Sequence, residues 1–403
     1  MTFTYYKMKF RLVSPLSVGS GEDEHTDCDV ALDSSGNPFI PATAFAGVIR
    51  HLCGAAPHSE VFGYIDGEKS AQSKIRFYDA FSVSKTFVTL RDMVALENKV
   101  GKKGAKFDQE AVEAQTDFVT LFELHNMTDA EQLQFIQALA AFDKGYLRLG
   151  SKTSRGYGQI KVIELKKACF VLPDDRAQWL DFEPYDWDSD TNYTNCQNEL
   201  REMEHTFLHF RLELKQNGAI SIRSYTARNG KEIGDADFEQ LSTSKGIPVI
   251  PGTSWAGAFR ERFRYFANDE QFTNEVFGFV NTDNNTQQKS KIYFSESSIS
   301  DSTRKIITRN SIDRFSAATK DGALYTENTV YNGNCELDLF LDKSISDLEK
   351  AKKILFAVIR DLHRGYLAVG GLTAVGRGLF NVTSMTVDGE DCTAAITEGG
   401  VSA

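Results

Sequence analysis

A segment rich in glycine and basic residues, KGYLRLGSKTSRGYGQIKV, runs from residue 144 to residue 162. Glycine lets a ligand approach the backbone amides, and lysine and arginine add positive charge, so this composition suits the binding of phosphate groups. A mononucleotide-binding P-loop requires glycine directly before its lysine, but Ser151 precedes Lys152 here. Two interpretations stay open: a cradle for the phosphates of a polynucleotide, and a tight connection in which glycines supply unusual backbone angles.

The same pattern returns near the end of the chain, as RGYLAVGGLTAVGRGLFNV at residues 364–382. At an offset of 220 residues, eight of nineteen positions are identical. A duplicated cradle suits a repeating polymer better than a single small ligand, which favours the polynucleotide interpretation. Tyr146 and Tyr366 match between the copies, and we expect both in the core rather than as platforms for base stacking. The candidate ligand-binding glycines are Gly150, Gly156, Gly158, Gly370, Gly376 and Gly378.

The duplication extends along both halves of the chain. PFIPATAFAGVIR (38–50) matches PVIPGTSWAGAFR (248–260) at an offset of 210 residues, with seven identities in thirteen positions. SKIRFYDA (73–80) matches SKIYFSES (290–297) at an offset of 217. GAKF (104–107) matches GALY (322–325) at an offset of 218. The offsets grow steadily and the order never changes, so the sequence predicts a duplicated domain with small insertions.

Each copy has the pattern of a mixed α/β domain. Alternation at Leu208, Phe210, Leu212 and Leu214 predicts the first strand of the second copy. A helix should follow the IP(A/G)T motif, with Thr43 and Thr253 as its N-caps and with Phe45, Ile49 and Leu52 as an apolar stripe in the first copy.

A second helix should begin in each copy with a capping box, at Thr128–Glu131 and at Ser346–Glu349. The glycine-rich loop and a final strand then close the domain. This order predicts two tandem ferredoxin-like, RRM-like domains of the α/β (α+β) class. The expected boundaries are residues 1–165 for the first domain, 166–204 for an acidic connector, 205–390 for the second domain and 391–403 for a C-terminal tail.

Composition limits the class of protein. The 403 residues contain 41% hydrophobic and 25% charged residues, as expected for a globular protein of two domains. We find no signal peptide and no apolar run long enough to span a bilayer, and the six cysteines form no CxxC pair, so we expect a cytoplasmic protein without a membrane partner. The net charge of −11 gives no support to nucleic-acid binding over the whole surface, although a local basic face stays possible.

The combination of IPATAFAGVIR (40–50) with LGSKTSRGYGQI (149–160) resembles the RAMP superfamily, and in particular the backbone subunits of type III CRISPR effector complexes. Those subunits carry a PLxIGSG turn, then an aspartate, and then a G-x-P-x-IPGSSLKGxxR segment. The first copy has SPLSVGSG at 14–21, whereas the second has NGAISIRS at 217–224 and has lost the turn. The second copy keeps a family-like central segment at 309–333.

The resemblance implies RRM-like domains with thumb-like extensions that hold guide (CRISPR) RNA beside other CRISPR effector subunits and act on complementary single-stranded target RNA. In catalytic members, one loop aspartate in each domain supports metal-dependent cleavage. The matching residues are Asp27 and Asp237, each nine positions before the glycine of G-x-P. Such a carboxylate could hold a divalent cation, with Mg²⁺ expected, or position the ribose 2′-hydroxyl for in-line attack. The alternative is that both are ordinary solvated acids, or that only one repeat cleaves.

The expected RNA contacts comprise the helix-terminal arginines of the two copies, the basic residues of the glycine loops and two arginines of the central segment. A helix-terminal arginine can instead simply complement the helix dipole. These residues are Arg50, Arg260, Lys152, Arg155, Arg377, Arg309 and Arg314.

Three other functions remain possible from the sequence. The first is a non-catalytic RNA-binding scaffold of the same kind of complex. The second is a guide-RNA processing endonuclease, which would generally rely on a catalytic histidine, but none of the seven histidines occupies matching positions in the two sets of motifs. The third is a protein unrelated to RNA in which the glycine loops are structural.

Overall fold

The computed structural model describes residues 1–21, 29–54, 56–97, 100–187, 189, 191–201, 206–224, 236–281 and 286–398. They form two compact units, each of mixed α/β structure, as predicted. The first unit contains residues 1–90, 107–153 and 157–205, and the second contains residues 91–106, 154–156 and 206–403.

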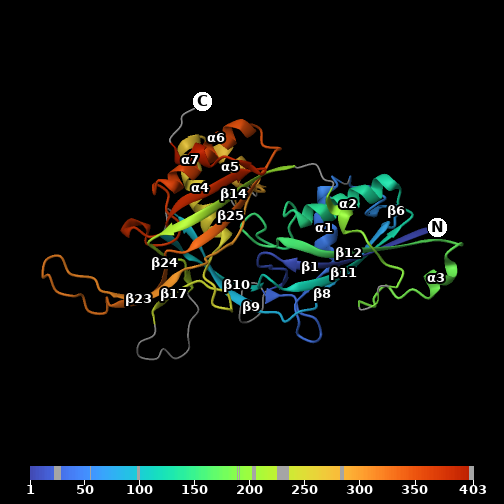
Figure 1. The fold of residues 1–403 in the computed structure, drawn as a ribbon, viewed down its shortest axis with the longest axis horizontal. Coiled ribbons are helices and arrows are strands. Elements are labelled where there is room, and N and C mark those ends of the chain that lie inside the picture. Colours follow the sequence, from blue (N-terminus) through green and yellow to red (C-terminus); the bar gives the residue numbers. More distant parts are fainter. Residues whose placement is uncertain are drawn as a thin grey trace. The chain divides into compact units, whose positions relative to one another are not determined.

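The first unit is built on a seven-stranded sheet with the order β13-β12-β1-β11-β8-β4, in which β7 also pairs with β11 (Figure 1). The central strand β1 runs antiparallel to both of its neighbours. The strands of this sheet are β1 (Thr2–Leu12), β4 (Phe39–Ile40), β7 (Ile75–Phe77), β8 (Ala80–Ser82), β11 (Asp117–His125), β12 (Ile160–Val171) and β13 (Thr194–Asn195).

Helices α1 (Ala42–Leu52) and α2 (Asp129–Asp143) cover one face of this sheet (Figure 1). Aromatic side chains join the layers: the ring of Phe122 on β11 lies 5.7 Å from that of Phe45 on α1 and 5.3 Å from that of Phe135 on α2. The predicted apolar residues Phe45 and Ile49 of α1 are buried, as is Phe135 of α2, and this burial stabilises the unit.

The other face of the sheet is covered by part of the segment that the sequence suggested as an acidic connector, residues 166–204. Its first residues continue β12 to Val171, and helix α3 (Arg176–Leu180) follows on that face, whereas the 3₁₀ helix η1 (Gln197–Arg201) packs against α2. Trp179 stacks on Phe3 of β1, with ring centroids 5.1 Å apart. The acidic composition thus hides a set of apolar side chains that pack on the sheet and place the segment in the first unit.

Three hairpins extend from the first repeat. Residues 22–28 and 98–99, which connect the strands of the first and the last of them, are outside the described residues. Their strands are β2 (Gly19–Gly21) with β3 (Asp29–Val30), β5 (Tyr64–Asp66) with β6 (Lys69–Ala71), and β9 (Val88–Glu97) with β10 (Val100–Val112).

The second unit contains a five-stranded sheet with the order β21-β25-β14-β26-β27 and a second sheet with the order β15-β24-β17-β16, in which β23 also pairs with β24. Two short pairs, β18–β22 and β19–β20, complete it. The strands are β14 (Phe207–Asn217), β15 (Ala219–Ile220), β16 (Arg223–Ser224), β17 (Phe238–Gln240), β18 (Val249–Ile250), β19 (Phe279–Asn281), β20 (Thr286–Gln288), β21 (Ile292–Phe294), β22 (Ser297–Ser298), β23 (Thr303–Arg309), β24 (Tyr325–Tyr331), β25 (Asn334–Asp342), β26 (Leu379–Val387) and β27 (Glu390–Asp391).

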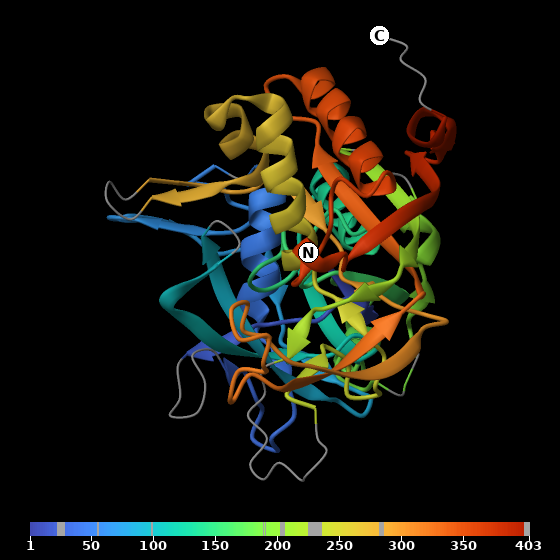
Figure 2. The same ribbon diagram turned by 90° about the vertical axis from the view of Figure 1, so that its left-hand side faces the viewer.

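Helices α4, α6 and α7 of the second unit pack on the five-stranded sheet and α5 packs on α4, and Figure 2 shows α4 and α6 side by side. The predicted C-terminal tail is partly helical, because residues 393–397 form α7 and its Ile396 is buried in the core of this unit. The helices are α4 (Gly252–Ala267), α5 (Glu270–Phe277), α6 (Leu348–His363), the 3₁₀ helix η2 (Thr373–Val375) and α7 (Thr393–Thr397).

The two repeats share the arrangement of their central strands. In the first unit β1 lies between β11 and β12, and in the second unit β14 lies between β25 and β26, always antiparallel. The register with the last strand is shifted at the same place, between Lys9 and Phe10 and between Glu213 and Leu214. The strand predicted from alternation at 208–214 is therefore confirmed, and a detail as local as a β-bulge is duplicated with the fold.

The predicted N-caps of the first helices are wrong. Helix α1 begins at Ala42 and helix α4 at Gly252, so Pro41 and Pro251 are the N-caps and Thr43 and Thr253 lie inside the first turn. Neither proline offers a side-chain hydrogen bond. In the first unit the carboxylate of Asp79 replaces it, because its Oδ1 accepts a hydrogen bond of 2.7 Å from the amide of Ala42.

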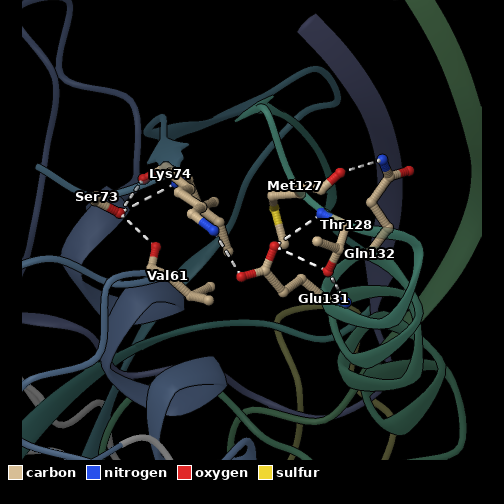
Figure 3. A network of polar contacts seen from close by, with 8 residues as sticks. Val61, Ser73, Lys74, Met127, Thr128, Glu131 and Gln132 are labelled. Carbon is tan, nitrogen blue, oxygen red and sulfur yellow. Dashed lines mark hydrogen bonds and ion pairs between the residues drawn. The ribbon is translucent and has the colours of Figure 1, made fainter. Parts of the chain in front are cut away.

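The capping box predicted for the second helix is confirmed in the first repeat. The side chain of Thr128 accepts a hydrogen bond from the amide of Glu131, and the side chain of Glu131 accepts one from the amide of Thr128 (Figure 3). Glu131 also forms an ion pair with Lys74, with an Nζ–Oε1 distance of 2.7 Å. The prediction of a capping box at Ser346–Glu349 in the second repeat is wrong. Asp347 is the N-cap of α6 and accepts from the amide of Lys350, while Ser346 donates to a carboxylate on α5.

No helix in the described part of the chain is both long and apolar enough to span a membrane. Cys28 lies outside the described residues, and the other five cysteines are free thiols. Burial raises the pKa of the Cys196 and Cys335 thiols to about 12, so both stay protonated at neutral pH and serve as core side chains.

Candidate nucleic-acid interface

In the sequence, each candidate aspartate comes two residues before an acidic residue in the second strand of a short hairpin. In the first repeat this hairpin is β2–β3, and in the second it is β16–β17. Asp29 of β3 and Glu239 of β17 match at the offset of 210 residues, so the hairpins occupy equivalent positions. Asp27, two residues before Asp29, lies outside the described residues. Asp237 lies two residues before Glu239, directly before β17.

Asp237 is exposed at the surface of the second unit, but its carboxylate is oriented by the backbone. Its Oδ2 accepts a hydrogen bond of 2.8 Å from the amide of Thr326. Its own amide donates to the carbonyl of Thr326 at 2.7 Å. Both bonds fasten the start of β17 to β24, so the carboxylate is held at a defined place near the surface.

The described residues contain no group of three or more histidine, cysteine, aspartate or glutamate side chains placed to hold a metal ion. A Mg²⁺ ion in proteins commonly uses one or two carboxylates, and waters and substrate phosphates complete its octahedron. The exposed carboxylate of Asp237 fits a site of that open kind, in which a phosphate of the bound nucleic acid supplies ligands. It does not form a closed structural metal site.

Behind Asp237, a buried cluster of charged side chains holds the hairpin in place. Glu327 on β24 lies 2.6 Å from Nη2 of Arg377 and 3.2 Å from Nη2 of Arg223 on β16. The guanidinium of Arg223 also stacks on Phe238, 4.1 Å from its ring centroid. These side chains join the glycine loop, β24 and both strands of the hairpin that carries Asp237.

Arg377 was predicted to contact RNA, and the structure gives its side chain another partner. It is only 2% exposed, and its guanidinium is held by Glu327. A buried charge is stable only with such compensation. RNA contact at Arg377 stays an untested prediction, whereas its placement supports a role in positioning the hairpin.

The glycines of the two loops approach neighbouring backbone. A side chain on Gly158 or on Gly378 would overlap the main chain of Leu149 or of Val369. Gly150 and Gly370 lie against the carbonyls of Ser17 and Ser221 in the same way, whereas Gly376 has open space around it. Gly156 is packed as well, since a Cβ there would lie 3.1 Å from the backbone of Gly252. Close packing therefore accounts for five of the six glycines, and contact of these glycines with RNA stays a prediction.

Arg50 lies in the last turn of α1, as expected, but the matching Arg260 lies in the middle of α4, which continues to Ala267, so the expectation of a helix-terminal arginine is wrong there. Each arginine binds the segment that follows its helix. Arg50 donates to the carbonyl of Pro57 at 3.2 Å. Arg260 donates to the carbonyl of Gly278 at 3.0 Å and to Oδ1 of Asn274 at 2.7 Å. Burial lowers the pKa of Arg260, although the group remains charged. The structure thus assigns both a local structural contact, and their RNA contact is untested.

The basic residues of the first glycine loop differ in their surroundings. Lys152 donates to Oε1 of Gln109, and its ammonium lies 4.3 Å from the ring centroid of Phe107. Arg155 is exposed, and its main chain pairs with Phe294 in the second unit. Arg155 is therefore the residue of this loop whose charge is presented to solvent.

The two arginines of the central segment lie on the hairpin formed by β23 and β24. Arg309 ends β23 and is partly exposed, and Arg314 is exposed in the connection that follows. Next to it, Phe315 is 98% exposed, and Ile306 and Leu324 are exposed as well. The hairpin thus combines positive charge with apolar and aromatic side chains at the surface. Proteins that bind single-stranded nucleic acids commonly present this combination.

The two tyrosines before the glycine loops do not behave alike. Tyr146 is buried, as predicted, but Tyr366 is 72% exposed, so the prediction of a core position is wrong there. Tyr366 directly follows the last residues of α6 and Gly365, where the chain runs along the surface.

Sequence reasoning missed two acidic residues that organise the second unit, Glu327 and Glu296. Glu296 forms an ion pair with Arg91 within that unit, with an Nη2–Oε1 distance of 3.2 Å. When the two repeats are aligned at the offset of 218 residues, Arg91 matches Arg309 and Gln109 matches Glu327, so that a neutral residue stands against an acidic one. Comparing the charges at such matched positions would have pointed to Glu327, whereas Glu296 matches another acidic residue, Asp79, at the offset of 217 and gives no such signal.

Comparison with known families assigns the chain. The model of the RAMP superfamily matches residues 9–161 and 225–381. The chain belongs to the RAMP superfamily. Since the two matched regions correspond to the two repeats, the protein contains two RAMP domains, and membership indicates a CRISPR-associated RNA-binding protein. No curated protein matches the chain.

Proposed function

We propose that this protein is a double-domain backbone subunit of a type III CRISPR ribonucleoprotein in the cytoplasm. It binds guide RNA and cleaves complementary single-stranded target RNA with the loop aspartates Asp27 and Asp237 in the presence of Mg²⁺. The observation that carries the proposal is the duplicated hairpin, which sets one aspartate two residues before an acidic strand residue in each RAMP domain.

The geometry around Asp237 supports a role in chemistry on a large ligand. Its carboxylate is exposed and fixed by the amide of Thr326, so a phosphodiester can reach it without rearrangement of the hairpin. Asp27 and Asp237 would each hold a divalent cation, which would stabilise charge on the scissile phosphate. The carboxylate could also orient the ribose 2′-hydroxyl, which would be the nucleophile, so that no serine or histidine of the chain is needed.

Contacts with the RNA backbone are proposed for the basic residues and glycines named from the sequence. Among them, Arg155 and Arg314 present exposed guanidinium groups, which suit contact with phosphates. Removing one phosphate contact should weaken binding by a similar factor for all RNA sequences and reduce the dependence of binding on salt.

The experiment maps cleavage of target RNA by the reconstituted complex. Wild type, Asp27→Asn, Asp237→Asn and the double variant are compared with Mg²⁺ and with chelator, and Asp174→Asn serves as a matched control at an exposed aspartate of the first unit. Each loop variant should lose one distinct cut while guide and target binding persist. Identical cleavage maps for all variants would show that these aspartates are solvated loop residues.

A non-catalytic scaffold in the same kind of complex is the second candidate. It is favoured by the hydrogen bond that the amide of Thr326 donates to Oδ2 of Asp237, because this bond occupies an oxygen that a cation would use. Intact target RNA in a complex that holds both RNAs and contains no other nuclease would select this function.

A further inference from the structure

A small cavity in the second unit is lined by residues of β15, β16, β17, β24 and the second glycine loop. Its volume is about 10 Å³, which is room for about one water-sized group. Three charged side chains belong to its lining. Arg377 and Glu327 are 2% and 1% exposed, and the side chain of Arg223 is mostly buried as well. The cavity is therefore a charged space inside one unit.

The two arginines of the lining have hydrogen-bond donors without an acceptor. Nη2 of Arg377 lies 2.6 Å from Oε2 of Glu327, and Nη2 of Arg223 donates to Oε1 of Glu327 at 3.2 Å. Among the described residues, Nε and Nη1 of Arg377 and Nε of Arg223 make no hydrogen bond, although all three atoms are buried. An unsatisfied donor of a buried charged group is costly, so we expect a bound acceptor in the cavity.

Neighbouring polar side chains of the lining are already engaged. Gln240 accepts from the amide of Ile222 at 3.0 Å and donates to the carbonyl of Val249 at 3.0 Å. Thr329 donates to the carbonyl of Ile220. Turning either side chain toward an arginine would leave buried backbone groups unpaired. The acceptor must therefore come from outside the chain.

Charge and size select the kind of acceptor. The arginines carry two positive charges and Glu327 one negative charge, so the buried group has a net positive charge. Glu239 also belongs to the lining, but it is partly exposed, and water screens its charge. A water molecule would accept hydrogen bonds and leave the excess charge in place, whereas a monovalent anion neutralises it. A space for one water-sized group excludes a phosphate group, so a halide ion fits best.

The first repeat replaces all three charged residues by uncharged ones. Offsets of 220, 218 and 204 residues relate the positions, and the last offset follows from matching hydrogen bonds of Gly158 to Pro15 and of Gly378 to Ala219. The residues that stand in place of Arg377, Glu327 and Arg223 are Tyr157, Gln109 and Gly19. Since the three charges are present together in one repeat and absent together in the other, they form one unit, and the second repeat alone has it.

We propose that Arg377 and Arg223 bind a chloride ion in this cavity. The ion accepts hydrogen bonds from the donors that the chain leaves unpaired, and it joins β16 to the second glycine loop. Glu327 holds both arginines in place and lowers the affinity for the anion, so the site exchanges its ion with the solvent. The site does not depend on cleavage of RNA. Only its consequence for the hairpin that carries Asp237 rests on the proposed function.

Bromide identifies the site, because it replaces chloride and scatters anomalously. The full chain is crystallised without RNA in bromide, and an anomalous peak is expected between the guanidinium groups of Arg377 and Arg223. In solution, chloride should raise the midpoint of thermal unfolding relative to gluconate at equal ionic strength, since gluconate is too large for the cavity. No peak and equal midpoints in the two salts would mean that water fills the cavity, which overturns the proposal.

Three variants test the assignment of the charges, with affinity taken from the dependence of the unfolding midpoint on chloride concentration. Glu327→Gln introduces the residue of the first repeat and should strengthen chloride binding by about tenfold or more, because it removes the negative charge. Arg223→Gln should weaken binding by about tenfold or more. Arg211→Gln, at an exposed arginine of β14, is the matched control and should leave it unchanged.

The sign of the Glu327→Gln effect decides even if Arg223→Gln does not fold. Equal chloride affinity in wild type and Glu327→Gln refutes the site, and so does a bromide peak without any response to chloride in solution, which would mark binding at crystal concentration only. A phosphate oxygen in the cavity of the complex with RNA would also overturn it. Loss of target cleavage in both salts concerns the proposed function instead, because the halide measurements contain no RNA.

Discussion

Gln109 in the first repeat and Glu327 in the second occupy matching positions, and the side chains around them differ in charge. Gln109 is buried and accepts a hydrogen bond from Lys152, a residue of the first glycine loop. Glu327 is 1% exposed and faces two arginines, Arg377 and Arg223. One repeat thus uses a neutral amide with a single cation, and the other buries a carboxylate between two cations.

The comparison shows that the same buried position of the fold can hold either a neutral amide hydrogen-bonded to a lysine or a carboxylate paired with two arginines. A buried ion pair is not in itself a gain in stability, because removing the charges from water costs about as much as their attraction returns. Its consequence is local order: the two arginines attach the hairpin of Asp237 to β24 and to the glycine loop. We infer that the second repeat fixes its aspartate from the interior of the unit.

The largest effect is expected when one partner of the buried cluster is removed. Arg377→Met leaves Glu327 with a single arginine in a buried site, and the free energy of unfolding should fall by about 3–5 kcal/mol. Urea denaturation measures it, with the two units followed as separate transitions where they resolve. Tyr157→Phe, at the matching position of the first repeat, is the control and should stay within about 1 kcal/mol of wild type. Equal losses in both variants would remove the contrast between the repeats.

The next effect separates glycines that are packed from glycines that are exposed. Gly378 and Gly376 both have positive φ, 74° and 80°, but only a Cβ at Gly378 would overlap the backbone of Val369. Gly376→Ala should cost about 1–2 kcal/mol from backbone strain. Gly378→Ala should cost about 1–3 kcal/mol more, because the overlap forces the chain to shift. Similar losses in thermal or urea unfolding would show that the loop relaxes freely around either position.

Much of the fold followed from the sequence because repetition and periodicity report directly on burial. The alternation at 208–214 and the stripe at Phe45 and Ile49 predicted β14 and α1, and both are present. The N-caps failed because Pro41 and Pro251 occupy the cap positions themselves, and in the first unit the missing hydrogen bond comes from Asp79, far away in the sequence. Local capping rules do not contain such contacts.

The candidate site was predictable only in part, for a similar reason. The choice of Asp237, nine positions before Gly246, came from the family resemblance and from the same register in the first copy, and the structure adds that it lies directly before β17. That Arg377 is buried could not follow from its own neighbourhood, since glycine-rich loops with arginine suit both phosphate binding and tight packing. Only Glu327, fifty positions away on β24, decides between solvent and interior for that side chain.

A smaller effect tests the difference between the two second helices. Asp347 caps α6 and Thr128 caps α2, so replacing either by alanine should lower the free energy of unfolding by about 1 kcal/mol. Ser346→Ala removes a hydrogen bond to Glu275 but leaves the cap of α6 intact. If Ser346→Ala reduces the helix content near α6 more than Asp347→Ala does, as seen by hydrogen exchange of the first-turn amides, the cap lies at Ser346 after all.

The smallest effect is a dependence on pH at the network of Figure 3. Partial burial raises the pKa of Glu131, but hydrogen bonds from Lys74 and Thr128 outweigh it, and the pKa lies below the ordinary value of 4.5. A carboxyl group with a lowered pKa in the folded state stabilises the fold above its ordinary pKa, and this contribution disappears as the pH falls through the lowered value. The advantage of wild type over Glu131→Gln should therefore be full near neutral pH and should shrink below about pH 4.5.

The same pH dependence can be measured in the second unit at Glu275, whose pKa is also lowered. Burial again raises its pKa, and hydrogen bonds from Ser346 and Lys291 lower it further than burial raises it. Glu275→Gln should therefore show the same narrowing in acid, while Glu183→Gln removes an exposed carboxylate as a matched control. Unfolding is followed at constant ionic strength between about pH 7 and pH 3, so that screening does not vary. Narrowing at Glu131 but not at Glu275 would mean that only the complete capping box, with its two reciprocal hydrogen bonds, keeps the carboxylate charged in acid.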